Sequence, residues 1–353
     1  PRAALLAGLL MASCLLPAVE ARLAKTDATL FFVTTAALGV LARAWLSRAA
    51  KLPGGLAFVF WIAIGAGILI KGPITLAVVG VAAIFLSIEQ GSFLWLGRLS
   101  PQWGAPLAIL IALPWFVAIT LTSGLAFFQE SLGRDMFQKV ASGVESHGAP
   151  PGTYTLAGLV TFWPASIALI PAIRPIFNRL GDPAIRFGLL SGLPLFLLFE
   201  AFPTKLPHYV LPLYPLAALM VGTVLDAGEA RVRGWFTRLA SFGGATMTGA
   251  LIIAAIIAAQ HFKEQPPFLT VAVLVPALAL GVLAGLLYAR SPIAGIVTAV
   301  ATAIVTYFAV FGLFLTDVTA FRLSGRLADA GRAALTCPDP QFASAGFTEP
   351  SIV

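Results

Sequence analysis

Long apolar runs separated by short polar loops dominate the sequence. Charged residues make up 10% of the 353 residues and hydrophobic residues 59%, whereas soluble domains carry roughly 25% charged residues. Several runs reach the roughly 20 residues that a helix needs to cross a bilayer. The pattern predicts an all-α, polytopic transmembrane helical bundle with about eleven spans, near 3–19, 28–46, 55–70, 73–89, 104–123, 156–173, 187–203, 208–226, 240–260, 268–289 and 292–315.

Lysine and arginine are unevenly distributed between alternate loops. The positive-inside rule assigns short, basic, acid-poor loops to the cytoplasm, so the net charge of +7 indicates membrane orientation, and we expect no nucleic-acid partner. The other loops, including the long one near 124–155, mix acids, histidine, tyrosine and cations, and we expect the active face there. The basic set consists of Arg43, Arg48, Lys51, Arg98, Arg174, Arg179, Arg186, Arg231, Arg233, Arg238 and Arg290.

Four charged residues, Glu20, Arg22, Lys25 and Asp27, lie in the loop between the first two apolar runs. We expect Asp27 to start a helix after Thr26, where the helix dipole stabilises an acid. One interpretation is a capped, solvated loop. The other is a carboxylate that faces a cavity, pairs with Arg22 or Lys25, and holds a metal or orients a hydroxyl.

Lys71 interrupts what is otherwise an apolar run of more than thirty residues, and Gly72 and Pro73 follow it. A lysine at the bilayer centre costs roughly 2.5–3.5 kcal/mol, so we expect a tight turn that brings Lys71 to the interface. There it either extends towards water as an anchor or faces an anionic lipid phosphate.

The segment 203–215 combines several prolines with Lys205, His208 and Tyr209 between two apolar runs. Prolines interrupt a regular helix, and irregular backbone at membrane depth is tolerated where it is buried in protein or lines a wet cavity. The segment is therefore either the wall of a site or an interfacial turn in which Lys205 and Tyr209 anchor the headgroup region.

The longest loop contains two further features. Apolar residues recur at helical spacing over 127–140, which predicts an amphipathic helix lying in the membrane surface, with Arg134 on it. Glu145 and His147 are candidate metal ligands, although two ligands are few for zinc and a lone loop histidine is more often solvated. Cys14 and Cys337 are too far apart in sequence to suggest a metal motif, and we expect no disulfide between them.

Four segments in order, 21–28 (ARLAKTDA), 71–73 (KGP), 205–212 (KLPHYVLP) and 346–353 (GFTEPSIV), resemble a known family. These are the polyprenyl-phosphate-sugar glycosyltransferases of the bacterial aminoarabinose transferase type. They are related to protein O-mannosyltransferases and belong to the glycosyltransferase-C superfamily. The resemblance implies about thirteen spans, a multi-pass protein of the bacterial inner membrane, periplasmic interfacial helices and an active site on the periplasmic face.

The resemblance also implies a domain organisation. Residues 1–315 would form an N-terminally truncated transmembrane glycosyltransferase domain, and 316–353 the truncated start of a periplasmic C-terminal domain. We therefore expect a fragment that lacks both ends, and the family's leading catalytic carboxylate would precede Pro1.

Residue by residue, Asp27 matches the family's second conserved acid and is the candidate catalytic residue. Lys205 and Tyr209 match its lipid-phosphate region, while Arg134 and His147 fall in the loop that in relatives approaches the donor and sometimes a metal. The candidate substrate-binding residues are Lys205, Tyr209, His208, Lys71, Arg134 and Arg22.

The resulting hypothesis is a membrane glycosyltransferase that moves a sugar from a polyprenyl-phosphate carrier to a lipid A-type or other cell-envelope acceptor. No cofactor is certain, and a divalent metal is possible. Two alternatives stay open. A flippase or transporter of lipid-linked sugars would show matching halves and mid-span ionisable residues, and a noncatalytic subunit would only present a lipid.

Overall fold

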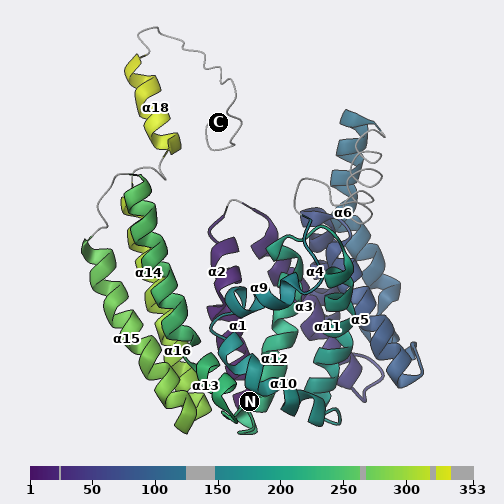
Figure 1. Cartoon of the computed structure of the whole chain (residues 1–353). Coiled ribbons are helices and arrows are strands. Elements are labelled where there is room, and N and C mark those ends of the chain that lie inside the picture. Colours follow the sequence, from purple (N-terminus) through teal and green to yellow (C-terminus); the bar gives the residue numbers. More distant parts are fainter. Residues whose placement is uncertain (24, 125–147, 263–267, 319–322, 335–353) are drawn as a thin grey trace.

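The computed structural model describes residues 1–23, 25–124, 148–262, 268–318 and 323–334. Its elements are helices (Figure 1). Within these ranges, the only strand-like pairing is an isolated antiparallel bridge between Gly148 and Thr204. The prediction of an all-α, polytopic membrane protein is therefore confirmed.

Every predicted apolar run contains an apolar helix. In the described ranges, eight helical segments are long and apolar enough to cross a membrane, and α1, α5 and α10 are apolar but shorter. The exact number of spans stays a prediction, because length and composition alone identify these segments. The first part of the chain forms α1 (Arg2–Ser13), α2 (Leu15–Glu20), α3 (Asp27–Leu46), α4 (Gly54–Lys71), α5 (Ile74–Gln90), η1 (Leu94–Leu99) and α6 (Pro101–Ser123).

The second part contains several runs that are not one continuous α-helix. The run near 208–226 begins as a 3₁₀ helix, and the run near 292–315 continues through a π-helical segment. The run near 156–173 is divided between two helices around Pro164, because proline lacks the N–H that a continuous helix requires. The elements are α9 (Thr153–Thr161), α10 (Ser166–Asn178), α11 (Pro183–Ala201), η4 (Pro207–Leu213), α12 (Tyr214–Asp226), α13 (Trp235–Ser241), α14 (Gly243–His261), α15 (Phe268–Arg290), α16 (Pro292–Tyr307), η5 (Phe308–Phe314), α17 (Leu315–Asp317) and α18 (Leu323–Ala334).

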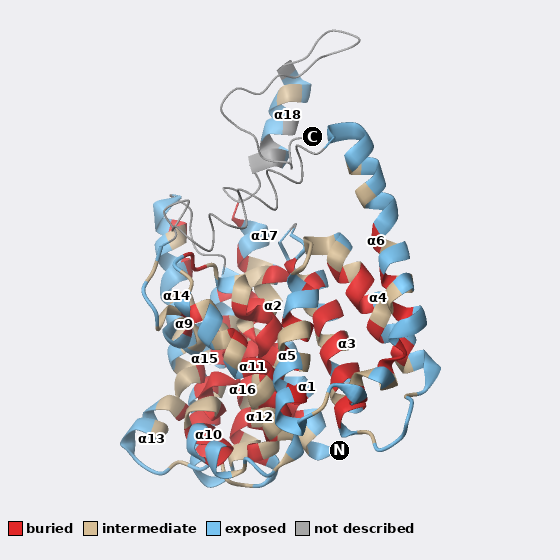
Figure 2. Cartoon of the chain, turned by 90° about the vertical axis from the view of Figure 1, so that its right-hand side faces the viewer, coloured by how far each residue is buried: buried red, intermediate tan, exposed pale blue. Residues whose placement is uncertain are grey.

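Two large clusters of buried apolar side chains form the core, and Figure 2 shows the buried residues, in red, inside the bundle. The first joins α1, α10, α12, α15 and α16, and the second joins α3, α4, α5, η1 and α6. Helices α11 and α12 contribute to both clusters. This pair therefore connects the two halves of the bundle, and the irregular segment between α11 and α12 lies at their junction.

Close helix packing depends on a glycine where α1 meets α12. A Cβ at Gly222 would lie 2.8 Å from the Ala3 carbonyl oxygen and 2.9 Å from the Ala7 amide nitrogen. Small residues let helix backbones approach in membranes, where van der Waals packing takes over much of the role that the hydrophobic effect plays in water. A larger residue at Gly222 would therefore separate α1 from α12.

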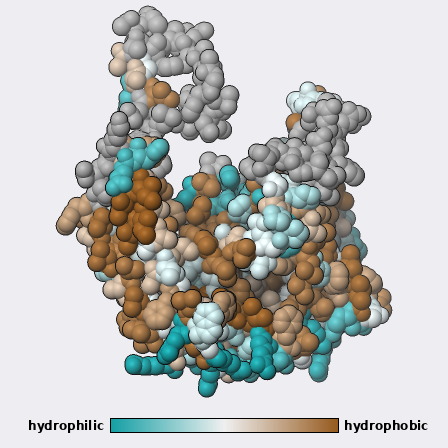
Figure 3. Space-filling view, in the orientation of Figure 1, coloured by the Kyte–Doolittle hydropathy of each residue, from teal (hydrophilic) through white to brown (hydrophobic). Residues whose placement is uncertain are grey.

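The polar loops gather at the two ends of the helices, with hydrophobic side chains between them (Figure 3). At one end, Arg98 Nη1 donates to the Ala44 carbonyl (3.0 Å), and Arg186 Nη1 lies 3.0 Å from Glu89 Oε1. At the other end, Asp27, Lys71 and the segment 203–208 come together. The two loop sets distinguished by charge thus lie at opposite ends of the bundle. The domain division at 315/316 stays a prediction.

We predict that Lys25 and Lys51 face opposite sides of the membrane, because both are exposed and they lie at opposite ends of the long helix α3. Each would be replaced by cysteine in a background without Cys14 and Cys337, and an impermeant maleimide applied before and after permeabilisation. One cysteine should react in intact cells and the other only after permeabilisation. Reaction of both from the same side would contradict the arrangement.

Candidate active site

Asp27 and Lys71 form a close ion pair at the junction of α3 and α4. The Lys71 Nζ lies 2.5 Å from Asp27 Oδ1, and the Asp27 side chain is 6% exposed. Asp27 is the first residue of α3 after Thr26, as predicted. Gly72 ends α4 with φ of 62°, a conformation that suits glycine, and so turns the chain into α5. The expected partner of Asp27 was Arg22 or Lys25, and that expectation is wrong, because Lys71 reaches the carboxylate from a different loop.

Arg22 instead joins α2 to η5. Its Nη1 donates to the Ala18 carbonyl (2.6 Å), and its guanidinium lies over the Phe311 ring, 4.6 Å from the centroid. A guanidinium over an aromatic face is attracted by the ring quadrupole. Arg22 therefore lies on the rim of this end of the bundle and remains a predicted substrate contact.

Glu20 and His208 meet beside this ion pair. His208 Nδ1 lies 4.0 Å from Glu20 Oε1, and the side chains are 14% and 6% exposed. Within the described part of the chain, Glu20 Oε2 has no hydrogen-bond partner. Burial raises the pKa of Glu20, the charge of Asp27 raises it further, and Lys25 and Lys71 oppose the shift.

Lys205 is buried and bound to the end of α11. Its Nζ donates to the carbonyls of Phe199 (3.1 Å), Glu200 (2.8 Å) and Phe202, and it lies 5.4 Å from the Tyr154 ring centroid. The last carbonyls of a helix lack intrahelical partners and carry partial negative charge. In this conformation the ammonium therefore stabilises a helix end, and contact with a lipid phosphate stays a prediction.

On an α-helix, the four-residue spacing of Lys205 and Tyr209 would place both side chains on one face. The helix after Pro207 is 3₁₀ and begins beyond Lys205, so the α-helical spacing argument does not apply. The His208 and Tyr209 rings are in edge contact, with centroids 5.1 Å apart.

Glu200 is a buried carboxylate that the sequence analysis did not select. Its two oxygens accept hydrogen bonds from the Gly152 amide (2.9 Å), the Thr155 amide (2.8 Å) and the Thr155 hydroxyl (2.9 Å). It thus fixes the start of α9 against the end of α11. The sequence did contain one indication that Glu200 is important: it lies near the end of an apolar run, where an ionisable residue needs a partner.

Three predicted residues, Arg134, Glu145 and His147, lie outside the described residues. Over the ranges that the structure describes, no group of three or more potential ligands among His, Cys, Asp and Glu side chains could hold a metal ion. The proposed metal ligands therefore stay a prediction.

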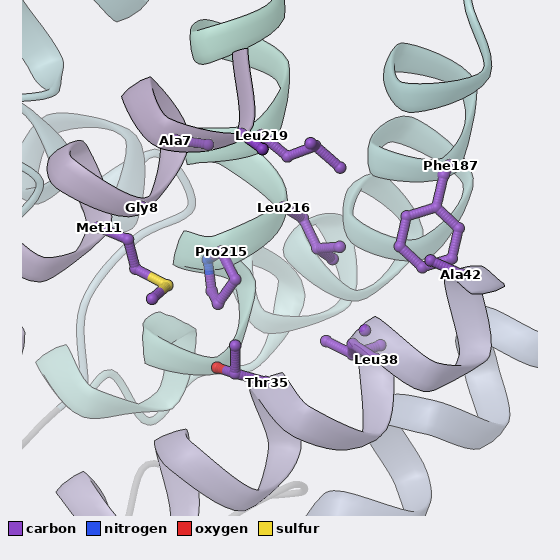
Figure 4. Close-up of a pocket in the computed structure, with 12 residues that line it drawn as sticks. Ala7, Gly8, Met11, Thr35, Leu38, Ala42, Phe187, Pro215, Leu216 and Leu219 are labelled. Atoms are coloured by element: carbon purple, nitrogen blue, oxygen red, sulfur yellow. The ribbon is translucent and has the colours of Figure 1, made fainter. Parts of the chain in front are cut away.

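An apolar cavity of about 250 Å³ opens between α1, α3, α11 and α12 (Figure 4). Met11, Thr35, Leu38, Phe187 and Leu216 contribute to its wall. The two glycines in its lining, Gly8 and Gly39, have open space where a Cβ would be. Thr35 is eight residues along α3 from Asp27, about 12 Å at 1.5 Å per residue, so the cavity lies deeper in the bundle than the charged groups.

Comparison with known proteins supplies independent evidence. No protein-family model matches the chain. The chain is 30% identical over 221 residues to the undecaprenyl phosphate-alpha-4-amino-4-deoxy-L-arabinose arabinosyl transferase of Edwardsiella ictaluri, covering 60% of this chain and 39% of that protein. It is 32% identical over 169 residues to the protein of the same name from Aeromonas hydrophila, covering 47% and 30%. The matched segments thus span well under half the length of these relatives.

Solved structures show the same resemblance in the fold. The structure of ArnT from Cupriavidus metallidurans bound to undecaprenyl phosphate matches with a TM-score of 0.70 and 19% identity, covering 96% of this chain and 62% of that one. Its apo form matches with a TM-score of 0.66 and 18% identity, over 95% and 62%. The chain therefore has a fold similar to that of these ArnT structures, and part of its sequence is similar to the named arabinosyl transferases.

Proposed function

We propose that the chain forms the membrane part of a glycosyltransferase that moves a sugar from a polyprenyl-phosphate carrier to a lipid A-type or other envelope acceptor. The observation that carries the proposal is the cluster of Asp27, Lys71, Glu20 and His208 at one end of the apolar helices, in which both carboxylates are buried and Lys71 and His208 are half-buried. The relatives whose names specify an undecaprenyl phosphate-linked donor support this substrate class.

The chemistry of such a transfer suits these side chains. The leaving group is a lipid phosphate that gains negative charge, which cations and hydrogen-bond donors stabilise. Lys71 has a side chain that is 34% exposed, so it can approach such a phosphate while it remains close to Asp27. A carboxylate at Asp27 would orient the acceptor or the cation. Tyr209, Arg134 and Lys205 remain proposed donor contacts, and Glu145 and His147 remain proposed ligands for a divalent metal.

The proposed location is the bacterial inner membrane, with the active face in the periplasm. The support is the loop asymmetry: the end opposite the charged cluster carries Arg48, Arg98, Arg179 and Arg233, as cytoplasmic loops do. The carrier and the acceptor would meet at the periplasmic surface of the bilayer.

The distribution of buried charge favours an enzyme over a lipid flippase. A transporter is expected to hold ionisable groups near the midplane between repeats. Among the described residues, the buried acidic and basic side chains, Glu20, Asp27, Glu200 and Lys205, all lie at or next to helix ends on the proposed active side.

The first test is the charge of Asp27. We expect Asp27→Asn to reduce transfer by at least a hundredfold in the purified, full-length membrane protein, because the nearly isosteric amide removes the charge paired with Lys71. Transfer would be measured from undecaprenyl phosphate-linked 4-amino-4-deoxy-L-arabinose to a lipid A preparation.

Asp226→Asn is the matched control for Asp27→Asn. Asp226 lies 3.6 Å from Arg2 at the opposite end of the bundle and should tolerate the amide. A parent protein with no transfer from this donor would overturn the proposed substrate. If the Asp27→Asn variant transferred the sugar as fast as the parent protein, Asp27 would have only a structural role at the start of α3.

Lys205 offers a test of two roles at once. If it binds the lipid phosphate, Lys205→Ala should lower kcat/KM for the donor by roughly ten- to a hundredfold, as loss of a charge-assisted hydrogen bond predicts, and Lys205→Arg should recover part of it. If it only stabilises the end of α11, thermal unfolding in detergent should shift downwards while the folded fraction keeps its kcat/KM. Unchanged stability and unchanged kcat/KM would contradict both roles.

The cavity gives a test of the lipid tail. We propose that it holds part of the donor's polyprenyl chain, so that Gly39→Leu should fill it and raise KM for an undecaprenyl donor by roughly three- to tenfold. The expected change in KM is modest because the lipid tail has apolar surroundings both in the bilayer and in the cavity. Entering the cavity therefore adds mainly van der Waals packing contacts. A short-chain donor should be unaffected, and so should Gly80→Leu on α5, which also has open space. Equal KM values for the long-chain donor in the parent and Gly39→Leu would exclude this cavity.

A further inference from the structure

Glu20 and His208 approach each other from separate parts of the chain. Glu20 ends α2, and His208 is the second residue of η4. Helix α2 and η4 pack against each other, and Oε1 and Nδ1 are 4.0 Å apart. Since Nδ1 faces the carboxylate, the other ring nitrogen, Nε2, is the one left to contact a substrate.

The Glu20 carboxylate lacks a close partner that would balance its burial. Its Oε2 has no hydrogen-bond donor among the residues that the structure describes, and the residue is 4% exposed. A buried, unpaired carboxylate is costly, and in such surroundings it attracts a proton or a cation. A proton on His208 would provide that cation at the nearest available position.

The other charged groups around Glu20 do not supply the cation that its buried carboxylate lacks. Asp27 at the start of α3 repels the carboxylate, while Lys25 in the loop and Lys71 at the end of α4 attract it. Lys71 is already paired with Asp27. Helix α9, which also packs against α2, brings Tyr154, whose hydroxyl donates to the Leu206 carbonyl and accepts from the Leu206 amide.

We infer that Glu20 and His208 form a proton-accepting dyad, in which His208 is the catalytic base and Glu20 is a positioning residue. Glu20 would hold the ring through Nδ1 and stabilise the imidazolium that forms, as carboxylates do for catalytic histidines in other folds. The 4.0 Å separation would shorten when substrate is bound, because catalytic hydrogen bonds are often long in unliganded structures.

The step deepens the proposed function and rests on it. The oxygen of an acceptor O–H forms a bond to the anomeric carbon of the donor sugar, and its proton passes to His208 Nε2. The bond between the anomeric carbon and the phosphate oxygen breaks, and its electron pair stays on the carrier phosphate. A neutral imidazole becomes an imidazolium, and the phosphodiester monoanion becomes a phosphomonoester dianion. The imidazolium of His208 then releases its proton to water, which restores the neutral imidazole.

The dyad gives the reaction a pH signature. Because His208 must be neutral to accept the proton, kcat should fall towards acid pH as the imidazole becomes protonated. Glu20→Gln removes the negative charge beside the ring, so the acid limb should move to lower pH and kcat should drop about tenfold. His208→Gln should abolish that limb and lower kcat about a hundredfold, within the range that general bases contribute.

Matched variants separate this role from a structural one. Glu229→Gln removes a carboxylate that is paired with Arg179 at the opposite end of the bundle, and His261→Gln removes an exposed histidine at the end of α14. Both should keep the kcat and the pH profile of the parent protein, and Glu20→Asp should keep part of the activity. A parent-like acid limb in folded Glu20→Gln would overturn the inference.

An infrared measurement distinguishes failure of the dyad from failure of the proposed function. The carboxyl C=O band of protonated Glu20 should titrate above the ordinary value of 4.5, disappear in Glu20→Gln and shift in His208→Gln. These changes need no donor. A parent without transfer would overturn the glycosyltransferase proposal whatever the band does, and a Glu20 band unaffected by His208→Gln would overturn the dyad.

Discussion

The structure depends on how the irregular backbone between α11 and α12 is stabilised where it is buried at one end of the bundle. Buried backbone groups that lack a partner are costly. Lys205 donates to carbonyls at the end of α11, and the Tyr154 hydroxyl bonds both the amide and the carbonyl of Leu206. Glu200 adds hydrogen bonds to the start of α9. With its backbone groups engaged in this way, the segment can hold His208 in a fixed position instead of forming another turn of helix.

The same constraint explains why the charged groups occur as a cluster. A single buried charge is expensive, whereas neighbouring opposite charges offset part of that cost. Asp27 and Lys71 form such a pair, and Glu20 and His208 lie beside it at the same end of the helices. The apolar cavity lies between α1, α3, α11 and α12, deeper in the bundle. Under the proposed function, the charged cluster would face the donor's phosphate and the cavity would hold part of its tail.

Local sequence signals gave several correct predictions because they report local physics. The apolar runs match apolar helices, and Asp27 begins α3 as its position after Thr26 suggested. Local periodicity alone was not sufficient everywhere. The apolar run near 156–173 is two helices, because Pro164 interrupts it. The resemblance to aminoarabinose transferases came from four short segments, and the fold match over 96% of the chain agrees with it.

By itself, the sequence determined the fold class, the two polar ends and the segments that carry the candidate site, because hydropathy and loop charge act along the chain. It did not determine which side chains meet. That Asp27 pairs with Lys71 rather than Arg22 or Lys25, that Lys205 binds the end of α11, and that Glu20 lies beside His208 were decided by packing between distant helices. A carboxylate can pair with any cation that reaches it, and only the tertiary structure specifies which cation does.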